Sequence, residues 1–449
     1  MSRVLLIYPF FRDFPDRSVF RFPPLGVGYV AAALREAGHE VRLLDCTFRK
    51  RSAALREALE AKAEVVGIYC MVSMTQDCFR LARRLRHRSR LLVAGGPLPT
   101  CDPAPFLEHF DVVVRGEGEQ TMKELLQALE EGSDLASVPG IAFRKAGAGA
   151  ITFTPQRTFR EDLDGMAFPA RDLLPNEHYI RQGKRRQGYS ITTVLSSRGC
   201  PYRCEFCSNV IFGSSYRERS AENVVDEIET ALGLGYDRIS FADDVFTMRP
   251  ARVREVCQEI RRRGLKFRWE CLGRVDSLDE PTARQMKKAG CSRVFFGIES
   301  GNDRILRLMN KGITTGQAAS AVEAARRAGL EVGAFFILGY PGETDRTVLE
   351  TLRFATALPL DYLGLTMPYP LPGTALLERV RSVREWRPAD SLLANHVLTF
   401  DADFSEAKLW FAILKGRAQF AIRRRLGPAG RPLLKLFETA TDALFRLLR

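Results

Sequence analysis

Three cysteines stand close together near the middle of the chain, and their spacing is C-x3-C-x2-C: Cys200, Cys204 and Cys207. Thiolates at this spacing can converge on one cube of iron and sulfide. They supply only three of the four ligands that a closed all-cysteine cluster needs. One iron is then left open, where a small molecule can chelate the metal and be activated. The motif therefore predicts an iron-sulfur cluster that binds a ligand.

Zinc is the alternative metal for such a loop. A structural zinc site closes with a fourth Cys or His at short spacing. No histidine lies between Tyr179 and Asn395, and the next cysteine along the chain is the distant Cys257. The spacing therefore favours iron and sulfide, and a zinc-holding nucleic-acid-binding protein is kept as the alternative from another class.

The segment after this motif alternates apolar strands with helical patterns. Six βα-type units between residues 191 and 374 predict a partial (β/α)6 barrel. Catalytic groups of barrels sit at the carboxyl ends of the strands. The polar and turn-forming residues expected at those ends are Asp243, Asp244, Arg274, Glu299, Ser300, Gly339, Pro341 and Gly342.

The first 150 residues alternate strands and helices in the same way, which predicts a doubly wound, Rossmann-like parallel sheet. Ligands of such sheets bind beyond the carboxyl ends of the strands. The segments there are rich in glycine, which lets the backbone approach a large flat ligand closely. The candidate binding residues are Pro24, Leu25, Gly26, Ser73, Gly95, Gly96, Gly116 and Glu117.

This region contains a partial match to the fingerprint of dinucleotide-binding sites. Gly26, Gly28 and Ala31 fit the pattern G-x-G-x-x-A, and Asp45 follows the second predicted strand. That fingerprint should begin directly after the first strand, whereas residues 10–24 intervene. The pattern therefore argues against nicotinamide binding.

Composition limits the remaining possibilities. The chain of 449 residues is long enough for two or three domains, and its cysteines outside the motif are scattered, as is typical of a reducing cytosol. We see no signal peptide and no apolar run long enough to span a membrane, so we expect a cytoplasmic protein. The formal net charge of +13 is compatible with nucleic acid, anionic lipid or an unspecific basic surface.

The chain is predicted to have four segments. A Rossmann-like domain at residues 1–150 precedes a linker at 151–190 and the barrel at 191–374, and a helical substrate or cap region follows at 375–449. The last region carries basic amphipathic helices, which either pack on the barrel or lie on a membrane surface. Peripheral membrane contact is thus kept open beside the cytoplasmic assignment.

The cysteine spacing, with the aromatic Phe206 before the third cysteine, resembles the radical S-adenosylmethionine (radical SAM) superfamily. The strand-end segments 23–31, 95–97 and 115–119 resemble the cobalamin-binding domain of the class B members of that superfamily. The resemblance implies a [4Fe-4S] cluster on the three cysteines, S-adenosylmethionine (SAM) on the cluster, and cobalamin, held without a histidine on cobalt, against the first domain.

The resemblance also assigns roles in the barrel. Glu299 would contact the SAM amino group or ribose, and Arg274 would contact the SAM carboxylate. The turn that holds Gly339, Pro341 and Gly342 would pass beneath the adenine. Asp243 and Asp244 match the D-D-x-F-T pattern of cobalamin-dependent members, in which these acids face the active cavity.

The activity implied is methyl transfer to an unactivated carbon of a small substrate, with apolar molecules among the candidates, through a 5'-deoxyadenosyl radical and methylcobalamin. An external electron donor of the flavodoxin or ferredoxin type would supply the electrons. Ring formation or oxidation on the same scaffold is the alternative. A methylthiotransferase acting on tRNA would need further clustered cysteines, whereas those of the first domain are scattered. Nucleic-acid binding would leave the glycine-rich strand ends unexplained.

Overall fold

The computed structural model describes residues 1–11, 22–145, 149–380 and 400–448. The chain divides into two compact units: one contains Met1–Cys200 and Asn209–Ile239, and the other contains Pro201–Ser208 and Ser240–Arg449. The segment limits predicted at residues 150, 190 and 374 do not coincide with this division and stay predictions.

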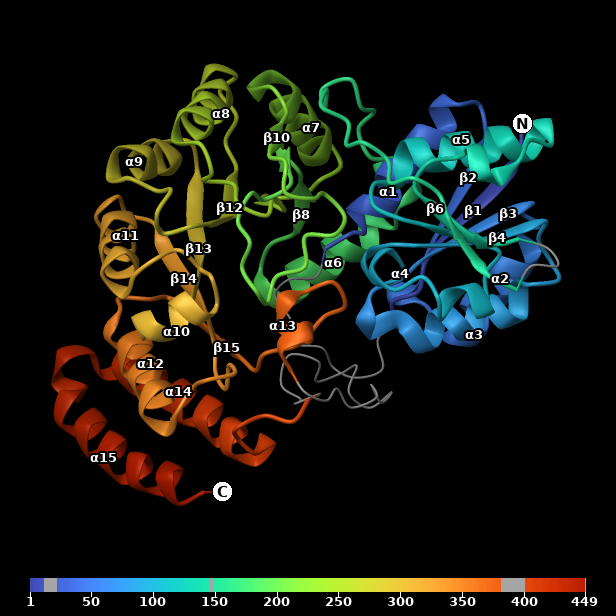
Figure 1. Cartoon of the computed structure of the whole chain (residues 1–449). Coiled ribbons are helices and arrows are strands. Elements are labelled where there is room, and N and C mark those ends of the chain that lie inside the picture. Colours follow the sequence, from blue (N-terminus) through green and yellow to red (C-terminus); the bar gives the residue numbers. More distant parts are fainter. Residues whose placement is uncertain (12–21, 146–148, 381–399, 449) are drawn as a thin grey trace. The chain divides into compact units, whose positions relative to one another are not determined.

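The first unit is built on a seven-stranded sheet with the order β2-β1-β3-β4-β5-β6-β7 (Figure 1). The first five strands are parallel, and β6 and β7 continue the sheet as an antiparallel pair. The strands are β1 Arg3–Tyr8, β2 Glu40–Asp45, β3 Val65–Tyr69, β4 Leu91–Gly95, β5 Val112–Val114, β6 Ile141–Arg144 and β7 Ile151–Phe153.

Helices cover both faces of this sheet, as Figure 1 shows. Alternate residues of a strand point to opposite faces. Leu6 therefore packs with α1 and α5 in one apolar cluster, while Ile7 packs with α2 and α3 in the other. Strands buried on both faces explain the continuous apolar runs of the sequence. The helices are α1 Leu25–Glu36, α2 Arg51–Glu60, α3 Thr75–Leu85, α4 Pro97–Cys101 and α5 Gly118–Glu131.

The segment predicted as a linker is more ordered than expected. Its first residues form β7, which pairs with β6, and its last third forms helix α6 Asn176–Gln187. Gly188 ends the helix in the left-handed conformation, with φ of 80°. α6 was not predicted, because its exposed residues are mostly polar and only Tyr179 is buried. The unit continues with β8 Ile191–Val194, β9 Ser197–Arg198, β10 Arg217–Glu218 and α7 Ala221–Gly233.

A six-stranded sheet with the order β8-β11-β12-β13-β14-β15 contains the strands predicted for the barrel. The division between the units runs through β11 Arg238–Phe241. In the second unit the parallel strands are β12 Arg268–Gly273, β13 Cys291–Glu299, β14 Glu331–Ile337 and β15 Tyr362–Thr366. The predicted fold class, a doubly wound domain followed by a partial barrel, is confirmed.

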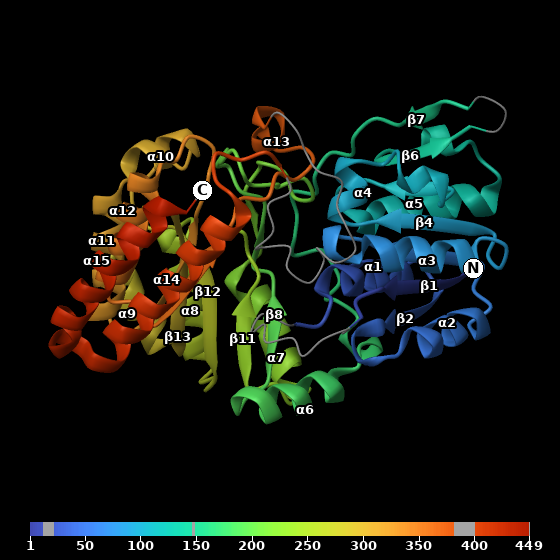
Figure 2. The same cartoon turned by 90° about the horizontal axis from the view of Figure 1, so that it is seen from below.

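Helices follow the strands of the second unit, and Figure 2 shows them along its outer side. Thr344 caps α12 in a capping box, as its position before the helix indicates. The short α10 was not predicted. The helices are α8 Pro250–Arg262, α9 Glu280–Lys288, α10 Asp303–Leu308, α11 Thr315–Arg327 and α12 Asp345–Ala357.

The C-terminal region is helical in the part that the structure describes. It contains α13 Ala375–Arg379, α14 Glu406–Leu426 and α15 Arg431–Leu447, and residues 381–399 of the predicted cap region lie outside the described residues. α14 packs on α12 and α15 packs on α14. Among the described residues, no helix is both long and apolar enough to cross a membrane.

Candidate functional site

The cysteine loop is held by the residue in its middle, Glu205. Its backbone N–H donates to the carbonyl oxygen of Met309 at 3.0 Å, and its own carbonyl accepts from the N–H of Leu376 at 2.9 Å. Its carboxylate accepts from the hydroxyl of Tyr340 at 3.0 Å and from the guanidinium of Arg379 at 2.6 Å. One residue of the motif thus ties the loop to α10, to the turn after β14 and to α13.

The two later cysteines lie on one tight turn, because the N–H of Cys207 donates to the carbonyl of Cys204 at 3.1 Å. Within the first unit, the N–H of Cys200 donates to the carbonyl of Gly213, also at 3.1 Å. In the described part of the chain, no three His, Cys, Asp or Glu side chains form a group that could hold a metal ion. Cluster ligation by the three cysteines therefore stays a prediction that depends on their spacing.

Glu299, the predicted SAM contact, lies at an irregular strand end. Its φ is +74°, in the left-handed region that non-glycine residues rarely adopt, and the pairing of β13 with β14 shifts beside it. The carboxylate is buried and pairs with the ammonium group of Lys311 at 3.0 Å. The same ammonium lies 5.7 Å from the ring centre of Phe206 in the cysteine loop. Such local strain is typical of functional sites.

Arg274, the predicted partner of the SAM carboxylate, has its guanidinium engaged within the second unit. It stacks on the ring of Tyr202 at 3.4 Å and donates to the carboxylate of Asp276 at 2.8 Å. It also donates to the carbonyl of Lys311 at 2.9 Å. Burial is the largest single influence and acts to lower the pKa of Arg274, but the hydrogen bond to Asp276 and the nearby negative charges together outweigh it, and the pKa is raised. The structure therefore shows Arg274 fastening the cysteine loop to the barrel.

The turn predicted beneath the adenine is closed by its own carboxylate. Glu343 accepts from the N–H groups of Gly339 at 2.6 Å and Tyr340 at 3.0 Å. Burial raises the pKa of Glu343 to about 7, although these two hydrogen bonds act to lower it. Gly339 has a φ of +87°, and a Cβ there would lie 2.4 Å from Leu409 of α14. The packing of α14 against this turn therefore requires glycine at position 339, and contact of the turn with adenine stays a prediction.

The other barrel residues occupy different surroundings. Asp243 is fully buried and Asp244 is exposed, so the two predicted catalytic acids do not share one environment. Both acids lie beyond the end of β11, and Asp244 stands at a bend of the chain. Ser300 is buried, and its hydroxyl lies 3.1 Å from that of Thr351 on α12. Its contacts hold the β13 end against that helix.

The glycine-rich edge of the first unit lies at a topological switch point, because the strand order reverses between β1 and β3. Ser73 follows β3 in a short 3-10 turn. Gly95 ends β4 and Gly96 follows it, and Gly96 has a φ of +107° and would place a Cβ 2.7 Å from the carbonyl of Cys70. A Cβ at Gly116, after β5, would not be crowded in this way, but the φ of +76° also favours glycine there. This edge is rich in glycine, and corrin binding there stays a prediction.

Three predicted contacts of this edge belong to a helix start. Pro24 is the N-cap of α1, and Leu25 and Gly26 form its first turn. Pro24 and Leu25 are buried, whereas Gly26 is exposed and has open space where a Cβ would stand. Only the backbone of this turn is therefore presented at the surface.

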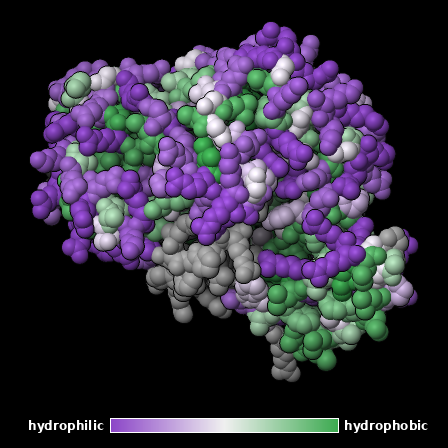
Figure 3. All heavy atoms as spheres, turned by 180° about the vertical axis from the view of Figure 1, so that it is seen from behind, coloured by the Kyte–Doolittle hydropathy of each residue, from purple (hydrophilic) through white to green (hydrophobic). Residues whose placement is uncertain are grey.

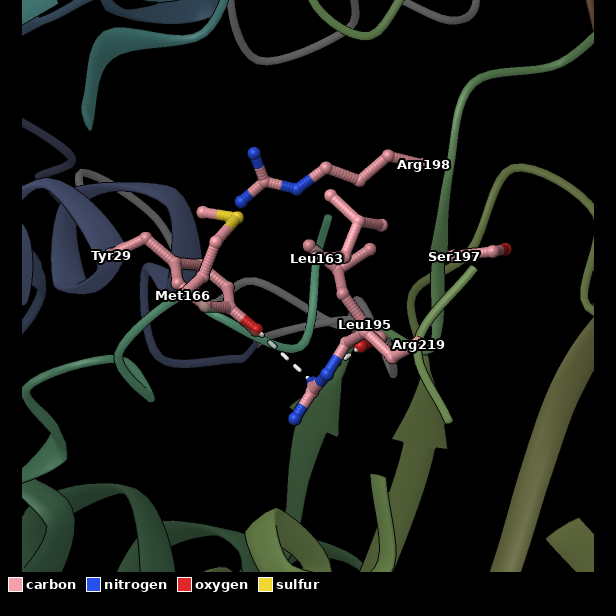
Figure 4. Close-up of a pocket in the computed structure, with 7 residues that line it drawn as sticks. All are labelled: Tyr29, Leu163, Met166, Leu195, Ser197, Arg198 and Arg219. Carbon is pink, nitrogen blue, oxygen red and sulfur yellow. Dashed lines mark hydrogen bonds between the residues drawn. The ribbon is translucent and has the colours of Figure 1, made fainter. Parts of the chain in front are cut away.

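Glu117, also predicted at this edge, belongs to a buried ionic network that the sequence analysis did not foresee. Its carboxylate pairs with Arg198 at 3.1 Å and with Arg217 at 3.0 Å. The guanidinium carbon of Arg198 lies 5.1 Å from the ring centre of Tyr29, and both side chains are drawn in Figure 4. These partners are far apart in the sequence, so no local pattern could indicate them.

The network continues behind Tyr29. The hydroxyl of Tyr29 donates to the buried carboxylate of Glu227 at 3.2 Å, and that carboxylate also pairs with Arg171 and Arg219. The cavity drawn in Figure 4 has a volume of only about 10 Å³. A cavity of this size admits about one water molecule. It is therefore a packing gap inside an ionic core, and not a substrate site.

Comparison with known proteins assigns both units. Residues 194–355 match the model of the radical SAM superfamily, and residues 16–126 match that of the B12 binding domain. The uncharacterized methyltransferase PH0819 of Pyrococcus horikoshii is 35% identical over 368 residues, which cover 79% of this chain and 78% of the relative. The chain belongs to the radical SAM superfamily. It is a radical SAM enzyme with a B12-binding domain, and the predicted membership is confirmed.

Other members of the radical SAM superfamily extend the comparison. The anaerobic magnesium-protoporphyrin IX monomethyl ester cyclase of Rubrivivax gelatinosus is 30% identical, over 84% of this chain and 70% of its own length. The methyltransferase TsrM of Kitasatospora setae, solved with cobalamin and a [4Fe-4S] cluster, shares the fold. Its TM-score is 0.71 at 23% identity, over 84% of this chain and 74% of that chain. These relatives include both a methyltransferase and a cyclase, so the family alone leaves the reaction open.

Proposed function

We propose that this chain is a cobalamin-dependent radical SAM methyltransferase that acts on an unactivated carbon of a small molecule. The observation that carries the proposal is the presence, in one chain, of a radical SAM domain and a B12-binding domain. The relative at 35% identity, named a methyltransferase, supports the same assignment.

The residues of the chain fit the cofactors of this chemistry. Cys200, Cys204 and Cys207 provide the three thiolates of a [4Fe-4S] cluster with one open iron. Glu299 and the turn from Gly339 to Glu343 are the candidate contacts of SAM. Ser73, Gly95, Gly96, Gly116 and the first turn of α1 form the candidate corrin edge, where a positive φ and missing side chains leave backbone exposed. Together these cofactors would supply radical formation and a transferable methyl group.

The proposed methyl transfer is balanced in atoms and electrons. One substrate C–H bond and two SAM molecules are consumed with two electrons, and the products are the methylated carbon, S-adenosylhomocysteine, 5'-deoxyadenosine and methionine. The electrons require an external donor, for which we propose a small acidic redox protein of the flavodoxin or ferredoxin type.

The chain's own residues hold the reacting groups in place. Glu205 and Arg274 fasten the cysteine loop, and Lys311 pairs with Glu299 beside it. Of the two candidate catalytic acids, we propose that exposed Asp244 reaches the substrate, whereas buried Asp243 positions the turn after β11. A carboxylate in a fully buried position is costly unless it is paired, which favours a structural role for Asp243.

A second function is favoured by one comparison, the relative named a cyclase at 30% identity. Ring formation or oxidation would use the same cleavage of SAM without methyl transfer. Products separate the two functions, because only methyl transfer also yields S-adenosylhomocysteine together with 5'-deoxyadenosine.

The test begins with the protein purified without oxygen, reconstituted with iron and sulfide, exposed to hydroxocobalamin and then desalted. We expect a broad iron-sulfur absorbance shoulder together with retained corrin bands. After reduction, the enzyme should release 5'-deoxyadenosine from SAM, and Cys204→Ala should abolish that release. An undiminished yield in the variant would contradict the radical assignment, while a cluster spectrum without corrin would contradict cobalamin dependence.

A further inference from the structure

The turn directly after α10 contacts the cysteine loop through two consecutive residues, Met309 and Asn310. The carbonyl oxygen of Met309 accepts from the N–H of Glu205 at 3.0 Å. The side-chain amide of Asn310 donates to the carbonyl oxygen of Arg203 at 2.8 Å, although the two residues are 107 positions apart in the sequence. The turn therefore bonds to the residues on either side of Cys204.

These two hydrogen bonds hold the backbone of Cys204. A peptide unit is planar, so a hydrogen bond to its C=O or N–H group orients the whole unit. The bond to the carbonyl of Arg203 holds the unit before Cys204, and the bond from the N–H of Glu205 holds the unit after it. The carbonyl of Cys204 also accepts from the N–H of Cys207 at 3.1 Å. With both units held, the direction in which the Cβ of Cys204 leaves the backbone is restrained.

Asn310 also ends helix α10. Its φ is +51°, and its N–H donates to the carbonyl of Arg307 at 3.0 Å. The N–H of Lys311 donates to the carbonyl of Leu306, also at 3.0 Å. These two bonds form a Schellman motif, in which glycine is the usual residue at the left-handed position and asparagine is less common. Glycine would serve helix termination alone at least as well, whereas asparagine adds a side-chain donor.

The bond from Asn310 differs in kind from apolar packing. Exposed apolar side chains of the second unit gather on α15, where Leu436 is 69% and Leu447 is 79% exposed, and Figure 3 shows a hydrophobic region over the C-terminal helices at the lower right. Apolar contact has no preferred direction, whereas a hydrogen bond does. Asn310 and Arg203 are both exposed, so their single neutral bond adds little to the free energy of unfolding. Its effect is therefore one of orientation.

We propose that Asn310 is a positioning residue for the cluster ligand Cys204: its amide fixes the peptide unit before this cysteine and so directs the thiolate. The inference rests on the proposed function, in which Cys204 binds the iron-sulfur cluster. Asn310 acts through Cys204 and touches neither SAM nor the substrate. Loss of the amide should leave the fold intact and change how the cluster responds to SAM.

The experiment uses variants of the full chain, purified without oxygen and reconstituted with iron and sulfide. Asn310→Gly keeps the left-handed backbone and removes the amide. Asn310→Asp keeps the shape of the side chain but, when ionised, has no hydrogen to donate. The matched control is Lys62→Gly, because Lys62 also has a positive φ, 47°, and lies in the first unit. Circular dichroism and thermal unfolding show that each variant is folded, and Asn310→Asp is the deciding variant if Asn310→Gly is less stable.

We expect both Asn310 variants to fold like the wild type and to release 5'-deoxyadenosine from SAM about tenfold more slowly. Adding SAM to the reduced cluster should change the electron paramagnetic resonance spectrum less in these variants than in the wild type. Loss of iron from both variants at unchanged thermal unfolding would also support the proposal, because it would show that the ligand is misdirected. Lys62→Gly should match the wild type in rate, spectrum and iron content.

A wild-type rate and a wild-type spectrum in the folded Asn310 variants would overturn the proposal and leave Asn310 with helix termination alone. The same losses in Lys62→Gly would overturn it too, because the effect would then not depend on the contact with Arg203. A wild-type chain that shows no iron-sulfur absorbance or no cleavage of SAM would contradict the proposed function itself, and the positioning role would fall with it.

Discussion

A single residue, Glu205, connects the cysteine loop to several other elements. The loop meets α10, α13 and the turn after β14 through its backbone and carboxylate. Hydrogen bonds to a charged group are stronger than neutral ones and are sensitive to geometry. A cluster with one open iron requires a loop that keeps its shape when a ligand binds.

We expect Glu205→Ala to lower the rate of SAM cleavage by about tenfold, because a mispositioned reacting group is costly even when it remains present. Adding SAM to the reduced cluster should change the electron paramagnetic resonance spectrum of the variant differently from that of the wild type. A purely structural defect elsewhere in the chain would leave this spectral change intact. Glu205→Gln should recover part of the rate.

The matched control is Glu378→Ala, which removes an exposed carboxylate from α13 beside Arg379. It should leave both the rate and the spectrum unchanged. If Glu205→Ala behaved like this control, Glu205 would have no positioning role.

The raised pKa of Glu343 predicts that the stability of the chain depends on pH. This pKa is raised by burial from 4.5 to about 7, so between these values the folded chain holds a proton that the unfolded chain has released. The raised pKa of Glu343 therefore contributes its full stabilisation of the folded chain below about pH 4.5, and this stabilisation is lost as the pH rises to about 7. Glu343→Gln stays neutral and should lack this dependence.

Chemical denaturation at pH 5 and pH 8 measures the effect. The difference in the free energy of unfolding, Glu343→Gln minus wild type, should rise by up to about 3 kcal/mol from the lower to the higher pH. Glu323→Gln, which removes a 63% exposed carboxylate from α11, should show no such gain. The same pH profile for the wild type and Glu343→Gln would rule out the raised pKa.

At the scale of elements, the candidate corrin edge depends on how strands end. Parallel strands bring their carboxyl ends to one edge, and glycines let the chain turn there without a side chain in the way. Gly96 and Gly26 test this idea, because both are predicted contacts but only Gly96 is crowded.

Gly96→Ala should destabilise the chain by about 2 kcal/mol, since the residue has a positive φ and its Cβ would meet the carbonyl of Cys70. It should also lower the retention of hydroxocobalamin after desalting. Gly26→Ala lies in the first turn of α1 with open space around it, so stability should stay equal or rise by up to about 1 kcal/mol. Thermal unfolding compares the two variants, and equal effects would argue against the crowding at Gly96.

At the scale of the whole molecule, the net charge of +13 affects encounters with other proteins. Attraction between a basic enzyme and an acidic electron donor weakens as salt screens the charges. With a reduced flavodoxin-type donor, the rate of SAM cleavage should fall several-fold between low and high ionic strength. With a chemical reductant in excess, the rate should change much less. A donor-supported rate that is independent of salt would show that charge does not guide the encounter.

Local features of the chain were sufficient for much of this result. The alternation of apolar strands and helices predicted both sheets, and the cysteine spacing, through its resemblance to the radical SAM superfamily, predicted the family. Each of these signals arises between residues a few positions apart, because strand and helix periods are set by the local backbone. Family membership and fold class could therefore be inferred before the structure was known.

Contacts between distant residues required the tertiary structure. The pairing of Glu299 with Lys311, the network around Glu117 and the opposite surroundings of Asp243 and Asp244 have no local signature. The same holds for α15, whose amphipathic pattern predicts a helix with one apolar side but not that this side faces solvent. Which side a helix buries, and which charges meet, is decided only when elements far apart in the chain pack together. The sequence by itself thus determined most of the elements and the family, and tertiary packing decided which side chains surround the cysteine loop.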